Sequence, residues 1–388
     1  MKADYLSTKL ALAFAVIAGL AIGNLYWAQP LLANIATSFG LPISDGGILV
    51  TATQVGYALG IFFLVPLGDI ASRRKLLLTV MSLTILTLVL CLLSPYFWFL
   101  SLALVLMGIC TVAGQIILPL TGDLAAPSQQ GKLIGIVVSG ITIGILLARF
   151  ISGIVVELAG WRSIYLLAVV LNLAALGLAW QCVPRGIPIK NHMSYMRLLL
   201  SVFTTAKCFP SMWTIFVIQG MVFGIIFNSF WTAMTFLLTE TFAFNTLQIG
   251  VFSLSGLTGA LAGVYLGGLH DKGRGGFYKG LFVIGTLVSM VASVYFYTSL
   301  IALLLIAAFF ALMMQGVSVI SQAQLFQLSD TERSRLNTAF VVSNFIFGAC
   351  GSLLATYLWK AGGWPLVAIG ATAASLLALL VWLWEEYR

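Results

Sequence analysis

The chain consists mainly of long apolar runs, each roughly 20 to 28 residues long and followed by a short polar turn. About 20 consecutive apolar residues are enough for a helix to cross the hydrocarbon core of a bilayer. The pattern therefore predicts twelve membrane-spanning helices. They are expected at residues 10–35, 46–68, 76–95, 97–123, 133–157, 161–182, 212–239, 248–270, 277–298, 300–327, 336–359 and 364–384.

The composition agrees with an all-α membrane protein. Hydrophobic residues make up 61% of the 388 residues and charged residues only 8%, whereas a soluble domain has roughly 25% charged residues. Little chain remains outside the spans for a soluble domain. The five cysteines lie in spans or in the central loop, so they predict no disulfide framework.

The basic residues give the expected orientation. With the N-terminus in the cytoplasm, sixteen of the nineteen Lys and Arg residues fall on the cytoplasmic side, Arg162 and Lys360 fall outside, and Arg149 lies within a span. This asymmetry follows the positive-inside rule and places both termini in the cytoplasm. The net charge of +8 is spread over short loops, so it does not indicate a nucleic-acid partner. The first apolar run lacks a small-residue cleavage site and is expected to be a helix rather than a signal peptide.

The two halves of the chain repeat each other. VVSGITIG at 137–144 returns as VVSNFIFG at 341–348, AGW at 159–161 matches GGW at 362–364, and Asp69 matches Asp271. The sequence therefore predicts two six-helix bundles, 1–182 and 212–388, joined by a cytoplasmic loop, 183–211. The loop stretch MSYMRLLLSVFTTAKCF fits either a helix lying on the membrane surface or a plain linker.

Several motifs resemble those of the major facilitator superfamily. PLGDIASRRK at 66–75 is similar to that family's loop motif between helices two and three, and SGITIGILLARFISG at 139–153 and RSRLN at 333–337 resemble a bacterial subgroup near the drug and sugar exporters. The resemblance covers nearly the whole chain. It implies a twelve-helix fold of two pseudo-symmetric bundles, with a substrate site between them that opens alternately to each side.

The loop motif also implies gating residues, namely Asp69, Arg73, Arg74 and, in the second repeat, Asp271. In the family the aspartate is placed at the N-terminus of the eleventh helix, where a carboxylate meets unpaired N–H groups. The other interpretation is that Asp69 only caps its loop. The glycines of the family pattern are Val65 and Ser72 in this chain, which loosens the turn.

Small residues form a stripe on the fifth and on the eighth expected helix. The stripes contain Gly140 and Gly144 on the fifth helix and Gly259 and Gly263 on the eighth, at intervals of four residues. Such spacing lets two helix backbones approach closely in lipid. The resemblance implies that the two stripes contact each other, and the alternative is that each packs within its own half.

Amide side chains separate an inner set of helices from an outer set. They concentrate on helices one, two, four, seven, ten and eleven, and Asn172 on helix six is an exception. Since amides against lipid are costly, these helices are expected to surround a central cavity. With nearby aromatic residues they predict a small-molecule site that includes Asn24, Tyr26, Trp27, Gln115, Asn228, Trp231, Gln315, Gln322 and Asn344.

Arg149 is the strongest single candidate. It lies about four residues, roughly 6 Å, outward of the middle of its span, and an arginine at this depth normally faces a cavity or a partner. None of the eleven acidic residues lies near a span centre. Arg149 therefore binds an anionic substrate group, takes part in ion coupling, or forms structural bonds to amides and carbonyls.

Ion coupling has weaker support. The span 97–122 contains no charge, so Asp123 and Glu240, at the ends of their helices, are the nearest titratable candidates besides Arg149. Proton coupling follows from the resemblance alone.

The sequence offers no cluster of His, Asp, Glu or Cys suited to an enzyme or a metal site, and no phosphate-binding glycine loop with a lysine. We therefore expect a monomeric, cofactor-free transporter in a bacterial inner membrane that exports a small organic compound. A facilitator or importer of an anionic solute, and a receptor that does not transport, are the alternatives.

Overall fold

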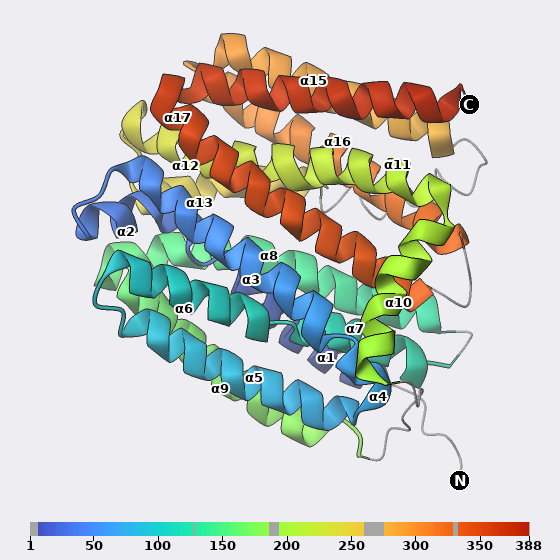
Figure 1. Cartoon of the computed structure of the whole chain (residues 1–388). Helices are drawn as coiled ribbons and strands as arrows, with labels where there is room; N and C mark the ends of the chain where they lie inside the picture. Colours follow the sequence, from blue (N-terminus) through green and yellow to red (C-terminus); the bar gives the residue numbers. More distant parts are fainter. Residues whose placement is uncertain (1–6, 127–128, 186–193, 260–274, 329–332, 388) are drawn as a thin grey trace. The chain divides into compact units, whose positions relative to one another are not determined.

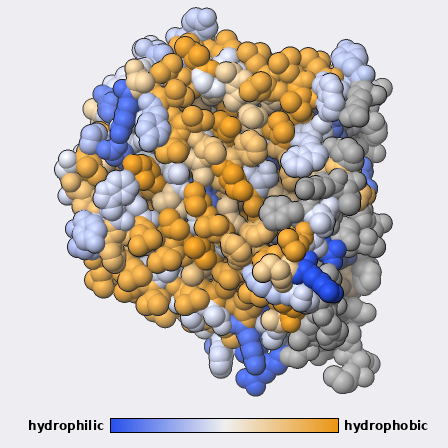
Figure 2. Space-filling model, in the orientation of Figure 1, coloured by the Kyte–Doolittle hydropathy of each residue, from blue (hydrophilic) through white to orange (hydrophobic). Residues whose placement is uncertain are grey.

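The computed structural model describes residues 7–126, 129–185, 194–259, 275–328 and 333–387, and all regular secondary structure in these ranges is helical (Figure 1). Nine helices of the described residues are long and apolar enough to cross a membrane. Their exposed surface is rich in apolar side chains, as the visible face in Figure 2 shows. Because such side chains favour lipid over water, this surface fits a membrane protein.

The count of nine differs from the expected twelve for local reasons. The expected first helix is divided into α1 (Thr8–Gly23), a 3-10 turn η1 (Gln29–Leu31) and α2 (Leu32–Ser38). The expected eleventh and twelfth helices run together in α17 (Arg333–Glu386), whose backbone turns at Gly362 and Gly363. Gly363 has a φ of +63°, which glycine adopts without strain. The expected eighth helix begins as α13 (Thr246–Phe252) and η4 (Ser253–Gly256) and continues into residues outside the description.

The chain forms two compact units. Unit 1 contains residues 1–28 and 52–200, and unit 2 contains residues 29–51 and 201–388. Each unit holds one of the two repeats, except that the segment 29–51 of the first repeat belongs to unit 2. This segment includes η2 (Ile43–Gly46) and the start of α3 (Gly47–Leu64).

Unit 1 is built from helices of the first repeat. They are α3 from residue 52 onward, α4 (Leu67–Ile70), α5 (Arg73–Leu92), α6 (Phe97–Cys110), α7 (Ala113–Leu124), α8 (Gln130–Ala159) and α9 (Arg162–Cys182), together with α1. α1 packs mainly on α8, and α5 packs on α9 and α6. The fourth expected helix is divided at Thr111 and Val112, which separate α6 from α7.

Unit 2 has the corresponding order. α11 (Pro210–Gln219) continues through a π-helical turn, η3 (Gly220–Ile226), into α12 (Phe227–Glu240), and α15 (Gly275–Phe296) and α16 (Leu300–Gln327) precede α17. α17 packs on η3, α12 and α15. Gly351 of α17 faces the carbonyl of Ile225, and a Cβ at this glycine would lie 2.5 Å from that oxygen. The first and seventh expected helices are therefore both irregular near their middles, which is common at functional sites.

The central loop contains a helix, α10 (Tyr195–Cys208). In unit 1 the Tyr195 hydroxyl donates to the carbonyl of Phe63 over 2.7 Å, and burial raises the pKa of Tyr195. Met196 and Leu200, one turn apart, are exposed, whereas Leu198 and Leu199 are buried. The stretch that fitted either a helix or a plain linker is therefore a helix, and its position on the membrane surface stays a prediction.

Segment 29–51 is tied to the second repeat by polar contacts within unit 2. Lys360 forms an ion pair with Asp45, and the hydroxyls of Thr51 and Ser352 lie 2.8 Å apart. The Thr235 hydroxyl also donates to the carbonyl of Gln29 over 3.2 Å. These contacts explain why 29–51 belongs to unit 2, although the rest of its repeat forms unit 1.

Candidate functional site

The break in the first expected helix brings three of the predicted site residues together in unit 1. Asn24, Tyr26 and Trp27 lie between α1 and η1, and their side chains are buried. Arg149, on α8, is only 3% exposed, and its guanidinium carbon lies 5.0 Å from the centroid of the Tyr26 ring. A cation over an aromatic face is stabilised most when water is excluded. The structure thus places the predicted arginine directly against a predicted aromatic residue.

The small-residue stripe of α8 explains how Arg149 comes so close to this break. A Cβ at Gly144 would lie 2.2 Å from the carbonyl oxygen of Gly19 in α1, and one at Gly140 would lie 2.5 Å from that of Ala15. The two backbones can approach this far only because both positions lack a side chain. Arg149 follows the stripe by little more than one turn, so α8 presents it beside α1.

The described glycines of both expected stripes make close contacts within their own units. Gly140 and Gly144 pack on α1 within unit 1, and Gly259 packs on α16 within unit 2, where its Cβ would lie 2.4 Å from the carbonyl oxygen of Ala311. Gly263 lies outside the described residues. For the three described glycines the close contacts are thus within one half, and the expected pairing of the two stripes stays a prediction.

Unit 2 contains three further predicted site residues, Asn228, Trp231 and Asn344, all buried. Asn228 donates its amide to the carbonyl of Gly224 over 2.9 Å, at the π-helical turn. Trp231 packs edge-on against Phe230, with ring centroids 5.6 Å apart. The aromatic cluster expected near the middle of the seventh helix is thus present on α12.

The predicted glutamines lie at the less buried positions. Gln115 on α7 and Gln315 on α16 are half-buried, and Gln322 on α16 is exposed. They belong to different units, Gln115 to unit 1 and the other two to unit 2. A common site formed by all the predicted residues therefore stays a prediction.

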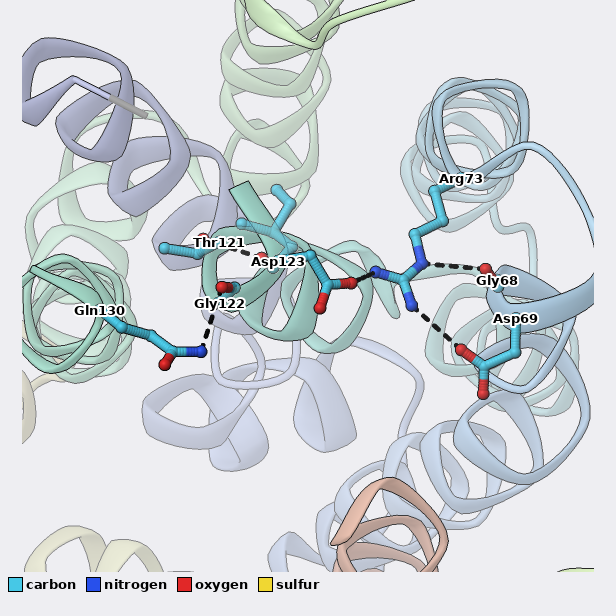
Figure 3. A network of polar contacts seen from close by, with 8 residues as sticks. Gly68, Asp69, Arg73, Thr121, Gly122, Asp123 and Gln130 are labelled. Atoms are coloured by element: carbon cyan, nitrogen blue, oxygen red, sulfur yellow. Dashed lines mark hydrogen bonds and ion pairs between the residues drawn. The ribbon is translucent and has the colours of Figure 1, made fainter. Parts of the chain in front are cut away.

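The loop motif forms a charged network at the start of α5 (Figure 3). The Arg73 guanidinium donates from Nε to the carbonyl of Gly68 over 2.9 Å, from Nη2 to Asp69 over 3.0 Å, and from Nη1 to Asp123 on α7. The Arg73 side chain is 7% exposed, whereas the two carboxylates are about one-quarter exposed. Because the planar guanidinium offers several donors in fixed directions, it can join α4, α5 and α7 at one point.

Arg74 has a separate role at the end of α9. Its guanidinium lies 5.5 Å from the Trp180 ring and donates to the carbonyls of Trp180 and Val183. Carbonyls at a helix C-terminus lack partners within the helix, and a cation there is also favoured by the helix dipole. Arg74 therefore caps α9, a structural contact within unit 1. Asp271, the fourth expected gating residue, lies outside the described residues.

The two acidic coupling candidates differ sharply in their surroundings. Asp123 is bound to Arg73 in the network just described. Glu240 is the last residue of α12 and is exposed.

Sequence analysis missed one buried ionic cluster. Lys279 counts among the charges on the cytoplasmic side, yet its side chain lies within α15 and is 1% exposed. Its ammonium is 2.6 Å from a carboxylate oxygen of Glu385 on α17 and donates to the Gln324 amide oxygen on α16 over 2.9 Å. The sequence carried one signal for this cluster. Lys279, Gln324 and Glu385 each lie at or next to the expected cytoplasmic end of a predicted helix.

The internal repeat offers a second signal. Trp180, which contacts Arg74, is repeated 202 positions later as Trp382, whose indole donates to the carbonyl of Gly276 over 2.9 Å. Gly276 is itself 202 positions after Arg74. The third and sixth helices of each repeat therefore meet at equivalent positions. In unit 2 a glycine, Gly276, stands at the position of Arg74, and the buried cation of α15 is Lys279, which pairs with Glu385.

We expect Glu385→Gln to lower the thermal stability of the detergent-solubilised protein. Removing one partner of a buried ion pair leaves the other charge uncompensated and costs about 3 kcal/mol or more. The double variant Lys279→Met, Glu385→Gln should recover most of the loss, because no buried charge then remains. Glu240→Gln, at an exposed carboxylate at the end of α12, is the matched control. A double variant no more stable than Glu385→Gln would contradict this account of the cluster.

No group of three His, Cys, Asp or Glu residues among the described residues could hold a metal ion.

Comparisons with known proteins show the family of the chain. The family model described as Major Facilitator Superfamily matches residues 14–279. The chain is 36% identical over 385 residues to a protein of Escherichia coli O157:H7 named "Uncharacterized transporter YgaY", covering 99% of this chain and 97% of that one. It is 25% identical over 235 residues to a protein of Pasteurella multocida named "Probable sugar efflux transporter", covering 60% and 57%.

A solved structure shares the fold. The crystal structure of a mutant of the nucleoside transporter NupG aligns with a TM-score of 0.75 at 15% sequence identity, over 97% of this chain and 99% of NupG. The helical architecture, the extent of the family match and the identity to YgaY together define the class of the protein. The chain belongs to the major facilitator superfamily and is a membrane transporter of small molecules, not an enzyme.

Proposed function

We propose that this transporter exports a small organic compound by alternating access and that Arg149 contributes to its substrate site. The observation that carries the proposal is the burial of the Arg149 guanidinium against Tyr26, at the break of the first helix. Irregular backbone within a membrane is tolerated where it is buried in protein or lines a cavity, and transporters place binding groups at such breaks. The efflux activity in the name of the Pasteurella multocida relative supports the direction of transport.

Arg149 also favours a substrate with an anionic group. A guanidinium binds a carboxylate or phosphate through paired hydrogen bonds, and its charge persists at any physiological pH. An importer or facilitator of such an anion is the second candidate function. The ring of Tyr26 would then pack beside the bound group, which suits a substrate with a flat apolar part.

The contacts of segment 29–51 support the alternating-access part of the proposal. In the predicted orientation this segment lies at the outer ends of helices one and two, and in unit 2 it is bound to the second repeat through Asp45 and Lys360. Outward opening would have to separate these contacts. A half-exposed ion pair and a few hydroxyl contacts suit such a step, since each contributes little stability.

The proposal includes the coupling of transport to protons. Asp123 is the better supported of the two acidic candidates, because protonating it would remove one of the two carboxylates that hold Arg73. Glu240 has no comparable link to a network among the described residues. We propose that coupling acts through the Arg73 network at the cytoplasmic ends of the helices.

Flux into proteoliposomes tests the function directly. A panel of paired compounds, each carboxylate with its neutral amide, would be measured with and without a pH gradient. Accumulation driven by an inside-acid gradient, with the carboxylate preferred, supports a proton-coupled exporter of anions. Equilibration without a gradient effect would support the facilitator, and binding without flux would support a receptor.

Asp69→Asn is expected to slow turnover several-fold while substrate binding is kept. The substitution weakens the hold on Arg73 but leaves Asp123 in place, and it lies outside the proposed substrate site. A comparison of kcat with the substrate Kd of purified protein separates the two effects. Loss of binding with unchanged kcat would count against a gating role for Asp69. Lys75→Gln, at the neighbouring position of the same motif, is the control.

A further inference from the structure

The break after α1 has lost the regular helical hydrogen bonds. The amides of Leu25 and Tyr26 donate three residues back, to Ile22 and Gly23, over 3.1 and 2.9 Å. Such tight bonds replace the four-residue spacing of the α-helix and have poorer geometry. The conformation of residues 24–28 therefore depends on contacts with other helices.

Asn24 supplies these contacts through a buried cluster of hydrogen bonds. Its amide exchanges two bonds with the amide of Asn172 on α9, over 3.2 and 3.1 Å. It also donates to the Thr111 hydroxyl over 3.1 Å. The Asn24 oxygen accepts from the Trp27 indole over 2.9 Å. All four side chains are at most 3% exposed.

Thr111 connects the two broken helices of unit 1. It lies between α6 and α7, and its hydroxyl donates to the carbonyl of Ala21 in the last turn of α1 over 2.7 Å. The breaks of the first and fourth helices are thus joined by one hydroxyl group that both donates and accepts. Since hydrogen bonds are strengthened in surroundings of low dielectric, this cluster holds both breaks rigidly.

A second support of the break comes from α8, the helix that carries Arg149. The Ser152 hydroxyl, one turn beyond Arg149, donates to the carbonyl of Trp27 over 3.0 Å. Between these two supports lies Tyr26, with its ring 5.0 Å from the Arg149 guanidinium carbon. A shift of the break would move the ring away from the guanidinium.

We propose that Asn172 and Thr111 are positioning residues for the substrate site. With Asn24 they lock the break of the first helix and thereby set Tyr26 against Arg149. These hydrogen bonds explain why α9, expected to be an outer helix, carries the amide of Asn172. An amide that faced lipid would be costly. The inference rests on the proposed role of Arg149, because it assigns positioning residues to that site, but its test requires no transport.

The test uses the full chain in detergent with two measurements that need no ligand. The first is hydrogen exchange of the backbone amides of residues 24–28. The second is the Arg149 Nε–H resonance in protein labelled with ¹⁵N-arginine, assigned by its loss in Arg149→Lys. The ring of Tyr26 shifts this resonance, and Tyr26→Leu gives its position without the ring.

Thr111→Val and Asn172→Leu remove the hydrogen bonds while keeping similar side-chain volumes. Each should accelerate exchange at residues 24–28 by about tenfold or more, as expected when a buried hydrogen bond is lost. Each should also move the Arg149 resonance toward its position in Tyr26→Leu. Thr111→Ser keeps the hydroxyl, so its exchange rate at residues 24–28 and its Arg149 resonance should be those of the wild type. Thr142→Val, where the hydroxyl donates to the carbonyl of Val138 in its own helix, is the matched control.

If hydrogen exchange at residues 24–28 is unchanged in both variants, Asn172 and Thr111 do not hold the break of the first helix, and the proposal is overturned. Faster exchange with an unmoved Arg149 resonance would overturn the positioning role and leave a purely structural cluster. If the proteoliposomes show no flux but both signals change as expected, the proposed function fails while the lock stands. The two conclusions are therefore tested separately.

Discussion

Arg149→Ala is expected to reduce transport by at least about 30-fold, because truncating one partner of a buried charge pair costs roughly 2 kcal/mol or more. The guanidinium is 3% exposed and lies over the Tyr26 ring, so a substrate anion bound there would be shielded from water. The folded protein should persist in the membrane, since the substitution removes a buried charge rather than adding one. Initial rates in proteoliposomes, normalised to reconstituted protein, measure the effect.

Arg162→Gln is the matched control for this prediction. Arg162, like Arg149, belongs to unit 1 and contacts an aromatic ring, with its guanidinium carbon 4.2 Å from the Trp161 ring. It lies at the start of α9 and also donates to the carbonyl of Ser94. Transport by this variant should stay near the wild-type rate. Equal losses in the two variants would show a general effect on the fold and remove Arg149 from the proposed site.

Arg149→Lys refines the same experiment. Lysine keeps the positive charge but lacks the planar pair of donors, so a carboxylate substrate should bind more weakly while remaining a substrate. We expect KM to rise with kcat less affected. A lysine variant as inactive as the alanine variant would indicate that the paired geometry, and not the charge, governs recognition.

Gly144→Ala is expected to destabilise the protein by about 3 kcal/mol, near the upper end for overpacking of a buried contact. The added Cβ, which is fixed to the backbone of α8, would lie 2.2 Å from the backbone carbonyl oxygen of Gly19 in α1. Neither can move without shifting α1 against α8, the main packing contact of α1. Thermal unfolding in detergent, followed by size-exclusion chromatography, measures the loss.

Gly135→Ala on the same helix should have the opposite sign. A Cβ at Gly135 would meet nothing within 4 Å, so the substitution only removes backbone freedom from the unfolded chain and stabilises the helix by roughly 0.5 to 1 kcal/mol. A loss of stability in both variants would mean that α8 tolerates alanine poorly throughout. Opposite signs of the stability change in Gly144→Ala and Gly135→Ala would show that the loss in Gly144→Ala comes from the contact with α1.

Local features of the sequence were sufficient for most of the architecture. The apolar runs gave the positions of the spans to within a few residues, as α5, α9 and α16 illustrate. The stripe of Gly140 and Gly144 predicted a close helix contact, and the isolated Arg149 pointed to a special environment. Each prediction depends on periodicity or hydropathy along one helix, which the chain carries locally.

The partner of each helix could not be read in the same way. The stripe on α8 contacts α1, and Lys279 is buried with Glu385 from a position more than 100 residues away. In lipid, several apolar helices are equally acceptable neighbours, and packing together with a few interhelical hydrogen bonds selects among them. That choice depends on all the helices at once.

The sequence by itself thus predicted an all-helical membrane transporter with an arginine inside its fifth span. Only the tertiary structure decided that the arginine faces Tyr26, that Asn172 of an outer helix holds the break beside it, and that segment 29–51 packs with the opposite repeat. The reason is that hydropathy and helical periodicity are properties of neighbouring residues, whereas these contacts join residues 120 or more positions apart.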